Sequence, residues 1–166
     1  MSWNAAAEGP VRASEQAVKA AYLHKLAPFI EWPAAAFGPP DEPITLCVVG
    51  ADPVSALVDD AGGSVPRSGE RGVRVRHLSA NDSEAGCHIL YIGTPGAAAV
   101  ALLDRARGKS ILTVTDAAPP GSRRGIVNFV VRDNRVRFEI DTDAAAQSRL
   151  AISSKLLNLA VRDGAP

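Results

Sequence analysis

Two glycines that follow apolar runs are the first residues whose placement suggests ligand chemistry. Gly50 ends the run from Ile44, and Gly93 ends a similar run from Cys87. A glycine between a strand and a helix holds a pyrophosphate in dinucleotide-binding folds, but that site needs three glycines at fixed spacing. Only Gly50 is present, and Pro53 removes an N–H from the start of the next helix. We interpret both glycines as ordinary strand-to-helix turns, with Gly93 the better candidate for a small ligand.

Metal chemistry has equally little support in the sequence. The three histidines, His24, His77 and His88, lack the spacing of zinc ligands. Asp141 and Asp143 precede a predicted helix, where a carboxylate more often caps the helix than binds a cation. The sequence therefore predicts no metal site and no cofactor.

Nucleophilic catalysis is suggested only by Ser153-Ser154-Lys155. This serine–lysine pattern does not make a dyad, because adjacent residues of a helix do not face one another and no flanking glycines expose a nucleophile. We therefore expect a protein that is not an enzyme and has no catalytic residues.

The two cysteines, Cys47 and Cys87, lie in separate predicted buried strands. They are either inert core thiols or a disulfide. A bridge that closes about forty residues would stabilise the fold by roughly 4 kcal/mol and would require an oxidising compartment. The residues themselves leave both alternatives open.

The composition of the chain limits the classes of protein to which it can belong. The chain has 166 residues, 46% of them hydrophobic, and a formal net charge of zero. This composition favours one domain, at residues 14–163, after a disordered or extended lead at residues 1–13. A neutral chain argues against nucleic acid as the partner, because that binding requires a basic face. The N-terminus lacks the charged and apolar regions of a secretory signal, so we expect any such signal to be missing from this sequence.

The order of elements predicts an α/β fold, with a mostly parallel sheet flanked by helices on both faces. The predicted strands are short apolar runs bounded by glycine or proline, as in buried parallel sheets. The strand with Arg74 and Arg76 alternates and is expected to be half exposed. The parallel strands are predicted at residues 44–50, 73–78, 87–93 and 111–114, with helices at residues 54–60 and 96–107 between them.

An antiparallel hairpin is predicted near the C-terminus. Asp133-Asn134 separates strands at residues 126–132 and 135–140, which is the spacing of a two-residue turn. Alternation in the second strand directs Val136, Phe138 and Ile140 to the core. The residues on the other face are Arg135, Arg137 and Glu139. Short helices are expected after Asp143 and at residues 153–161.

The first helix is predicted to begin with Ser14 as its N-cap and to end or kink at Pro28. The aromatic residues in and after this helix form either a ligand box or, more simply, the packing of the helix on the sheet. These residues are Tyr22, Phe29, Trp32 and Phe37.

Several blocks together resemble the YfiR family, over about residues 15–161. Each block is weak alone, and their order and spacing carry the resemblance. The blocks are AAYLHKLAPFIEWP (20–33), ITLCVVG (44–50), CHILYI (87–92), IVNF (126–129), RVRFEI (135–140) and ISSKLLNLA (152–160).

This resemblance implies a periplasmic protein that represses an inner-membrane diguanylate cyclase by binding the periplasmic domain of that enzyme. Repression would lower cyclic-di-GMP and biofilm formation, and an outer-membrane lipoprotein of the OmpA type would sequester the repressor. The resemblance also implies a homodimer. Some members carry a second cysteine pair in the hairpin region, and this sequence has none there, so redox sensing by such a pair is not expected.

Site residues follow from the same resemblance. Cys47 and Cys87 fall where the family carries an intramolecular disulfide, and partner contact is implied around the hairpin and the last helix, at Glu139 and Ile152. The strand alternation adds Arg137 to this predicted contact.

A second hypothesis of a different class is a small-molecule sensor. Its ligand would bind at the carboxyl ends of the parallel strands, near Gly50, Gly93 and the loop at residues 116–125.

Overall fold

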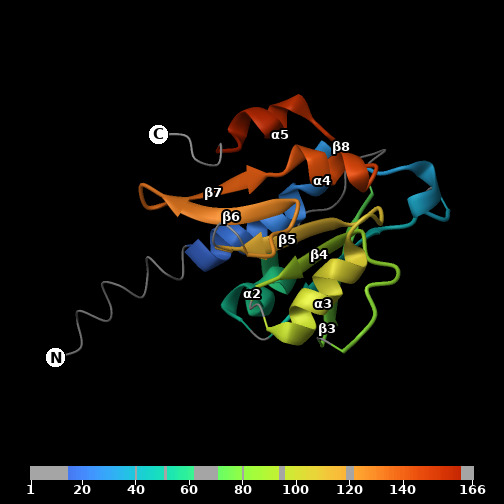
Figure 1. The fold of residues 1–166 in the computed structure, drawn as a ribbon, viewed down its shortest axis with the longest axis horizontal. Helices are drawn as coiled ribbons and strands as arrows, with labels where there is room; N and C mark the ends of the chain where they lie inside the picture. Colours follow the sequence, from blue (N-terminus) through green and yellow to red (C-terminus); the bar gives the residue numbers. More distant parts are fainter. Residues whose placement is uncertain are drawn as a thin grey trace.

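A six-stranded sheet organises the domain (Figure 1). The computed structural model describes residues 15–39, 41–50, 52–61, 71–79, 81–93, 96–118 and 122–161. The strand order is β3-β2-β4-β5-β6-β7, and only β7 runs antiparallel to its neighbour. The strands are β2 (Ile44–Val49), β3 (Val73–Leu78), β4 (Ile89–Ile92), β5 (Leu112–Asp116), β6 (Val127–Arg132) and β7 (Arg135–Ile140). The predicted fold class is confirmed.

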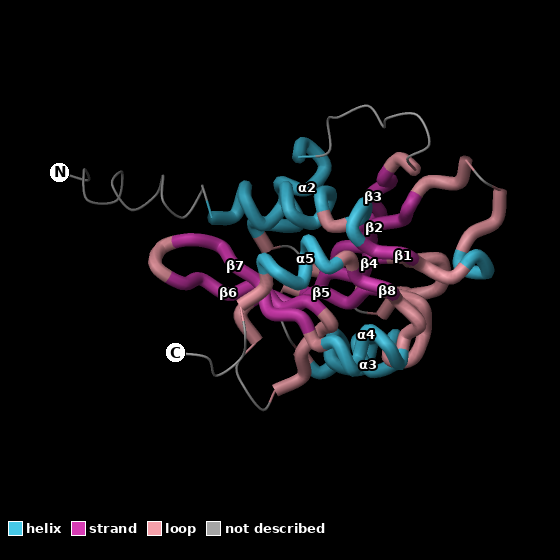
Figure 2. The backbone as a smooth tube through the Cα atoms, turned by 90° about the horizontal axis from the view of Figure 1, so that it is seen from above, coloured by secondary structure: helices cyan, strands magenta, loops and turns pink. Residues whose placement is uncertain are grey.

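Helices cover both faces of the sheet (Figure 2). The first helix, described over residues 15–25, and α2 (Pro53–Ala61) lie on one face, and α3 (Ala97–Ala106) lies on the other. All six residues of β2 are buried, as expected for a strand covered on both sides. Residues 1–13, predicted to be a disordered or extended lead, and Ser14, predicted to be an N-cap, lie outside the described residues.

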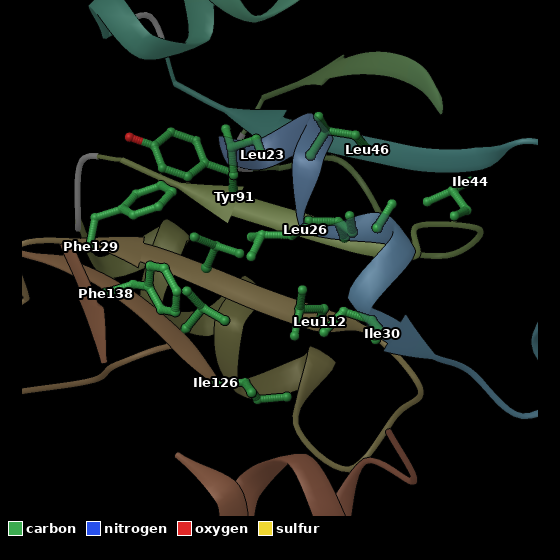
Figure 3. Close-up of a cluster of buried hydrophobic side chains, with 14 of the residues drawn as sticks. Leu23, Leu26, Ile30, Ile44, Leu46, Tyr91, Leu112, Ile126, Phe129 and Phe138 are labelled. Atoms are coloured by element: carbon green, nitrogen blue, oxygen red, sulfur yellow. The ribbon is translucent and has the colours of Figure 1, made fainter. Parts of the chain in front are cut away.

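The larger core lies between the first helix and the sheet (Figure 3). Leu23 and Leu26 point from the helix onto Leu46 and Tyr91, and all four side chains are almost fully buried. Each buried leucine of this kind contributes roughly 1.5–3 kcal/mol to folding. Burial of these leucines therefore places the first helix on the face of the sheet that carries Leu46 and Tyr91.

The opposite face has a smaller core that contains a disulfide. Cys47 of β2 and Cys87 are bonded, with Cα atoms 5.8 Å apart and a sequence separation of 40 residues. Both sulfurs lie in the cluster that packs under α3, with Val49 and Leu102. The bridge implied by the family resemblance is present. One predicted boundary is wrong: β4 begins at Ile89, so Cys87 and His88 precede the strand.

The hairpin has the predicted turn. Asp133 and Asn134 have φ values of 54° and 61°, the left-handed conformation that a type I′ turn requires at both positions. Asparagine and aspartate tolerate this conformation better than other residues with side chains. The turn sets the register that places Phe129 opposite Phe138.

Some elements at the ends of the chain differ from the prediction. The first helix ends before Pro28, as predicted, but β1 (Ile30–Glu31) then pairs with β8 (Ala151–Ile152) in a small antiparallel sheet. This pairing was not predicted, because a strand of two residues has no detectable periodicity. The C-terminal helices are α4 (Thr142–Gln147) and α5 (Ser154–Leu159), and Asp141 caps α4 by accepting the Ala144 N–H, as predicted.

Within the described residues, no helix is long and apolar enough to cross a membrane.

A buried carboxylate attaches the segment before β4 to α3. Glu84 is 5% exposed and accepts hydrogen bonds from Arg105 Nε at 2.9 Å and Lys109 Nζ at 3.0 Å. These two bonds, Arg105 first, hold the pKa of Glu84 below its usual value of 4.5. The sequence did not reveal this anchor, because Glu84 lies in a polar stretch that predicts only a loop.

We expect the disulfide to contribute roughly 4 kcal/mol to stability, because it restricts a loop of about forty residues in the unfolded chain. Reduction should therefore lower the melting temperature, measured by thermal denaturation with and without reductant. The Cys47→Ala/Cys87→Ala variant is the control and should melt at one temperature in both conditions. An intact mass that shows two free thiols in the native protein would contradict the bridge.

The Glu84 anchor predicts a specific pH dependence. Because the folded pKa lies below the unfolded pKa, the contribution of Glu84 is present above about pH 5 and is lost as the pH falls through the folded pKa. Glu84→Gln should cost about 1–2 kcal/mol at pH 7 and progressively less below pH 4.5. Urea unfolding across this pH range measures it, with the exposed Glu31→Gln as control. A pH-independent difference would show that the charge is not the cause.

Candidate functional site

The carboxyl ends of the parallel strands bring together five charged or polar side chains. Tyr91 Oη of β4 lies 3.1 Å from Asp52 Oδ2 and 3.4 Å from Asp116 Oδ2. Lys19 Nζ of the first helix lies 2.9 Å from Asp116 Oδ1, and Ser55 donates to Asp52 at 2.6 Å. This is the sheet edge at which α/β folds hold ligands.

Most of these groups satisfy one another, but Asp116 Oδ1 is buried and accepts no hydrogen bond from the described residues, with only the Lys19 ammonium 2.9 Å away. Lys19 is 8% exposed at its side chain, so its charge is balanced by Asp116 inside the protein. Burial, and then the charges of Asp116 and Asp52, raise the pKa of Tyr91, so its hydroxyl stays protonated and donates. A side chain at Gly93 would collide with Asp52, which explains the glycine there. The cluster is therefore a set of structural contacts that closes this edge.

Little space remains at that edge among the described residues. A cavity of about 20 Å³ adjoins Asp116, Ala118 and Arg123, which is room for one water molecule. The predicted ligand region also includes residues 51, 94–95 and 119–121, which lie outside the described residues. The described part of this edge thus offers no volume for a metabolite.

A larger pocket lies at the other end of the sheet. Its volume is about 550 Å³, and it opens between the start of β6, the end of β7 and α5. The wall is mixed: Arg124 and Glu139 face apolar groups such as Leu157. The complete lining is Arg124, Gly125, Ile126, Asn128, Glu139, Ile140, Asp141, Thr142, Leu157, Asn158, Ala160 and Val161.

A buried polar network forms the floor of this pocket. Asn128 is 2% exposed and accepts from Thr115 Oγ1 at 2.7 Å and from the Ala118 N–H at 3.1 Å. Its amide donates to Glu139 Oε1 at 3.1 Å, and Arg124 Nη1 lies 3.2 Å from the same oxygen. Because each buried group has a partner, the network holds Glu139 in one position.

The predicted contact residues lie in different environments. Arg137 is exposed on β7. Glu139 lies on the same face, as the alternation predicts, but it is 7% exposed and paired with Arg124. Ile152 is half-buried in β8, opposite Ile30. Only Glu139 lines the pocket, and their role in partner contact stays a prediction.

Two residues at this site were missed or misplaced from the sequence. Arg124 lies in a loop rich in proline and glycine that gave no sign of a buried ion pair. Leu157, in the last helix, was not expected at a site; it is 36% exposed and lines the pocket, while Leu156 is buried. A helix that packs one side chain per turn leaves the neighbouring leucine outside the core.

The aromatic residues form two packing clusters and not one ligand box. Tyr22 contacts Phe129 and Phe138, with ring centroids 6.2 and 5.9 Å away, so it packs the first helix on the sheet, as predicted. Phe37 stacks on His88 at 4.4 Å, and His88 Nδ1 accepts the Thr45 N–H at 2.9 Å. His88 is thus a buried structural residue.

Comparison with known families follows the same boundaries as this domain. The model of the YfiR/HmsC-like family matches residues 16–161. The chain belongs to this family. A search of curated proteins returned no match. YfiR-like domains are regulatory, noncatalytic and periplasmic, and the disulfide of this chain is consistent with that setting.

The burial of Glu139 predicts that its charge reversal disturbs the fold. Glu139→Lys would place a cation beside Arg124 in the buried network, and we expect a loss of about 3 kcal/mol in the free energy of unfolding. Arg137→Glu, on the same strand but exposed, should change stability by less than about 0.5 kcal/mol. Urea unfolding of both variants tests this. Equal stabilities would contradict the network, whereas the expected result makes Arg137 the better probe of partner binding.

Proposed function

We propose that this protein is a noncatalytic periplasmic regulator that binds the periplasmic domain of an inner-membrane diguanylate cyclase and represses it. Repression lowers cyclic-di-GMP and with it biofilm formation. The observation that carries the proposal is membership of the YfiR/HmsC-like family over residues 16–161. The polar cluster at the sheet edge also supports it, because its donors Tyr91, Lys19 and Ser55 are already engaged by Asp52 and Asp116.

The disulfide supports the compartment. A bond between Cys47 and Cys87 persists in an oxidising environment and is rare in a reducing cytoplasm. Both sulfurs are buried, so the bond stabilises the fold and is shielded from exchange with other thiols. It suits a domain that must remain folded outside the cytoplasm.

The proposal includes two further protein contacts. One is a homodimer, and the other is an outer-membrane lipoprotein of the OmpA type that sequesters the repressor and so releases the cyclase. Exposed apolar side chains support protein contacts of this kind: Leu159 is 58% exposed and Leu157 is 36% exposed, both on α5.

A second candidate function is a small-molecule sensor, and the pocket of about 550 Å³ favours it. The pocket lies at the opposite end of the sheet from the predicted ligand region, and its wall combines the Arg124–Glu139 pair with apolar groups. A thermal-shift screen with amino acids, vitamins and nucleotides separates the two functions. Stabilisation by a compound that leaves cyclase binding unchanged would favour sensing alone.

Cyclase repression is the direct test. Membranes that contain the cognate cyclase should retain the added protein and should produce several-fold less cyclic-di-GMP than membranes without it. Arg137→Glu should weaken retention by about tenfold, which corresponds to about 1.4 kcal/mol. Arg74→Glu on β3 is the matched control, because Arg74 is also an exposed strand arginine. Cyclase output that is indifferent to the wild-type protein would exclude the proposed function.

A further inference from the structure

The tip of the β6–β7 hairpin carries a row of unneutralised arginines. Arg132, Arg135 and Arg137 are all exposed, and none of them forms an ion pair with any described residue. The hairpin projects beyond the other labelled strands in two perpendicular views (Figures 1 and 2). These cations therefore face solvent at a protruding part of the fold.

Their arrangement costs stability. Arg132 and Arg135 are directly opposite in the strand register, where like charges repel. Arg137 lies on the same face, because residues two apart in a strand point to one side. The other face of the tip is apolar and includes Val131, which is 43% exposed. Asp133 lies in the turn between Arg132 and Arg135 but forms no ion pair with them, so the tip, with three arginines and one aspartate, keeps a net positive charge that suits an acidic partner.

Among the described residues, the outer edge of β7 is unpaired at the same tip. The Asp141 N–H donates to the Ile126 carbonyl at 2.8 Å, so the odd-numbered residues of β7 direct their backbone groups to β6. The even-numbered residues direct theirs outward, and there the Phe138 carbonyl accepts the Val161 N–H at 2.8 Å. The described chain supplies no partner for the backbone groups of Val136. The edge near the tip can thus accept another strand.

The opposite edge of the sheet is different, although it is also rich in arginine. Near β3, Arg71 donates to the Glu42 carbonyl at 2.8 Å and lies 3.8 Å above the Phe37 ring. Arg76 of β3 donates to the Ala85 carbonyl at 3.3 Å. Arg71 and Arg76 thus donate hydrogen bonds to loops of the same chain, whereas the hairpin arginines make no such bond to the described residues. Arg74 of β3 is exposed and has no partner among the described residues, so the contrast is between this single arginine and the row of three at the hairpin.

We propose that the free edge of β7 binds an extended acidic segment of a partner protein, which adds to the sheet as a strand and sets its carboxylates against Arg135 and Arg137. Main-chain hydrogen bonds to Val136 supply affinity, and the arginines select the charge of alternate side chains. That this segment belongs to the cyclase rests on the function proposed above. An anionic membrane is a poorer match, because a lipid headgroup makes no use of an open strand edge.

Synthetic peptides test this directly. The probe is a capped six-residue peptide that alternates glutamate with valine, and binding is followed by NMR of the full protein. We expect shifts and slowed hydrogen exchange at the Val136 amide, and binding that weakens several-fold between 50 and 200 mM salt. The double variant Arg135→Glu/Arg137→Glu should bind about tenfold more weakly. Arg137→Gln repeats the test with a milder change, and Arg74→Glu should bind like wild type.

Three results would overturn the inference. The first is equal binding of a peptide with lysine in place of glutamate, and the second is equal binding of a peptide N-methylated at alternate residues, which cannot pair as a strand. The third is binding only to vesicles of phosphatidylglycerol and not to the acidic peptide, which would assign the arginines to a membrane. The cyclase assay separates the two proposals. Repression by wild-type protein without peptide binding refutes only the strand addition, whereas absence of repression refutes the regulatory function.

Discussion

Burial of β2 on both faces is the constraint on which the rest of the structure depends. Its six residues are all buried, with Leu46 facing the first helix and Cys47 facing α3. Because one face must be covered by each helical layer, the positions of both layers follow from this strand. The disulfide to Cys87 then joins β2 covalently to the start of its neighbour β4. A covalent bond as well as the hydrogen bonds of the sheet therefore joins these two strands.

Ion pairs also hold the helical layers against the two faces of the sheet. Lys19 of the first helix forms an ion pair with Asp116 at the end of β5. Glu84, in the segment before β4, forms an ion pair with Arg105 of α3. A buried charge that loses its partner is costly, so each pair specifies one arrangement of helix and sheet. Among the described residues, the cavity at the carboxyl edge, where a nucleotide would bind in related architectures, measures only about 20 Å³. What remains open is the far pocket and the hairpin.

The open features lie near one another, at the β6–β7 end of the domain. The pocket, the exposed leucines of α5 and the arginines of the hairpin all adjoin β7 or the helix beside it. This division gives the domain one distinctive surface, at the β6–β7 end. A ligand in the pocket would touch Glu139, two residues from Arg137 on the same strand face, so sensing and partner binding are physically compatible here.

Local patterns in the sequence alone determined the parallel strands, the helices between them and the hairpin turn at Asp133-Asn134. These follow from periodicity and turn chemistry within a few residues, which any sequence displays directly. The cysteines illustrate the limit: their burial was predictable from the strands, but their pairing required the family resemblance. Only the tertiary structure decided that Glu139 is buried, that Lys19 reaches Asp116 and that β1 pairs with β8. The reason is that these contacts join residues far apart in the chain, and no local pattern records which distant group will balance a charge or complete a strand.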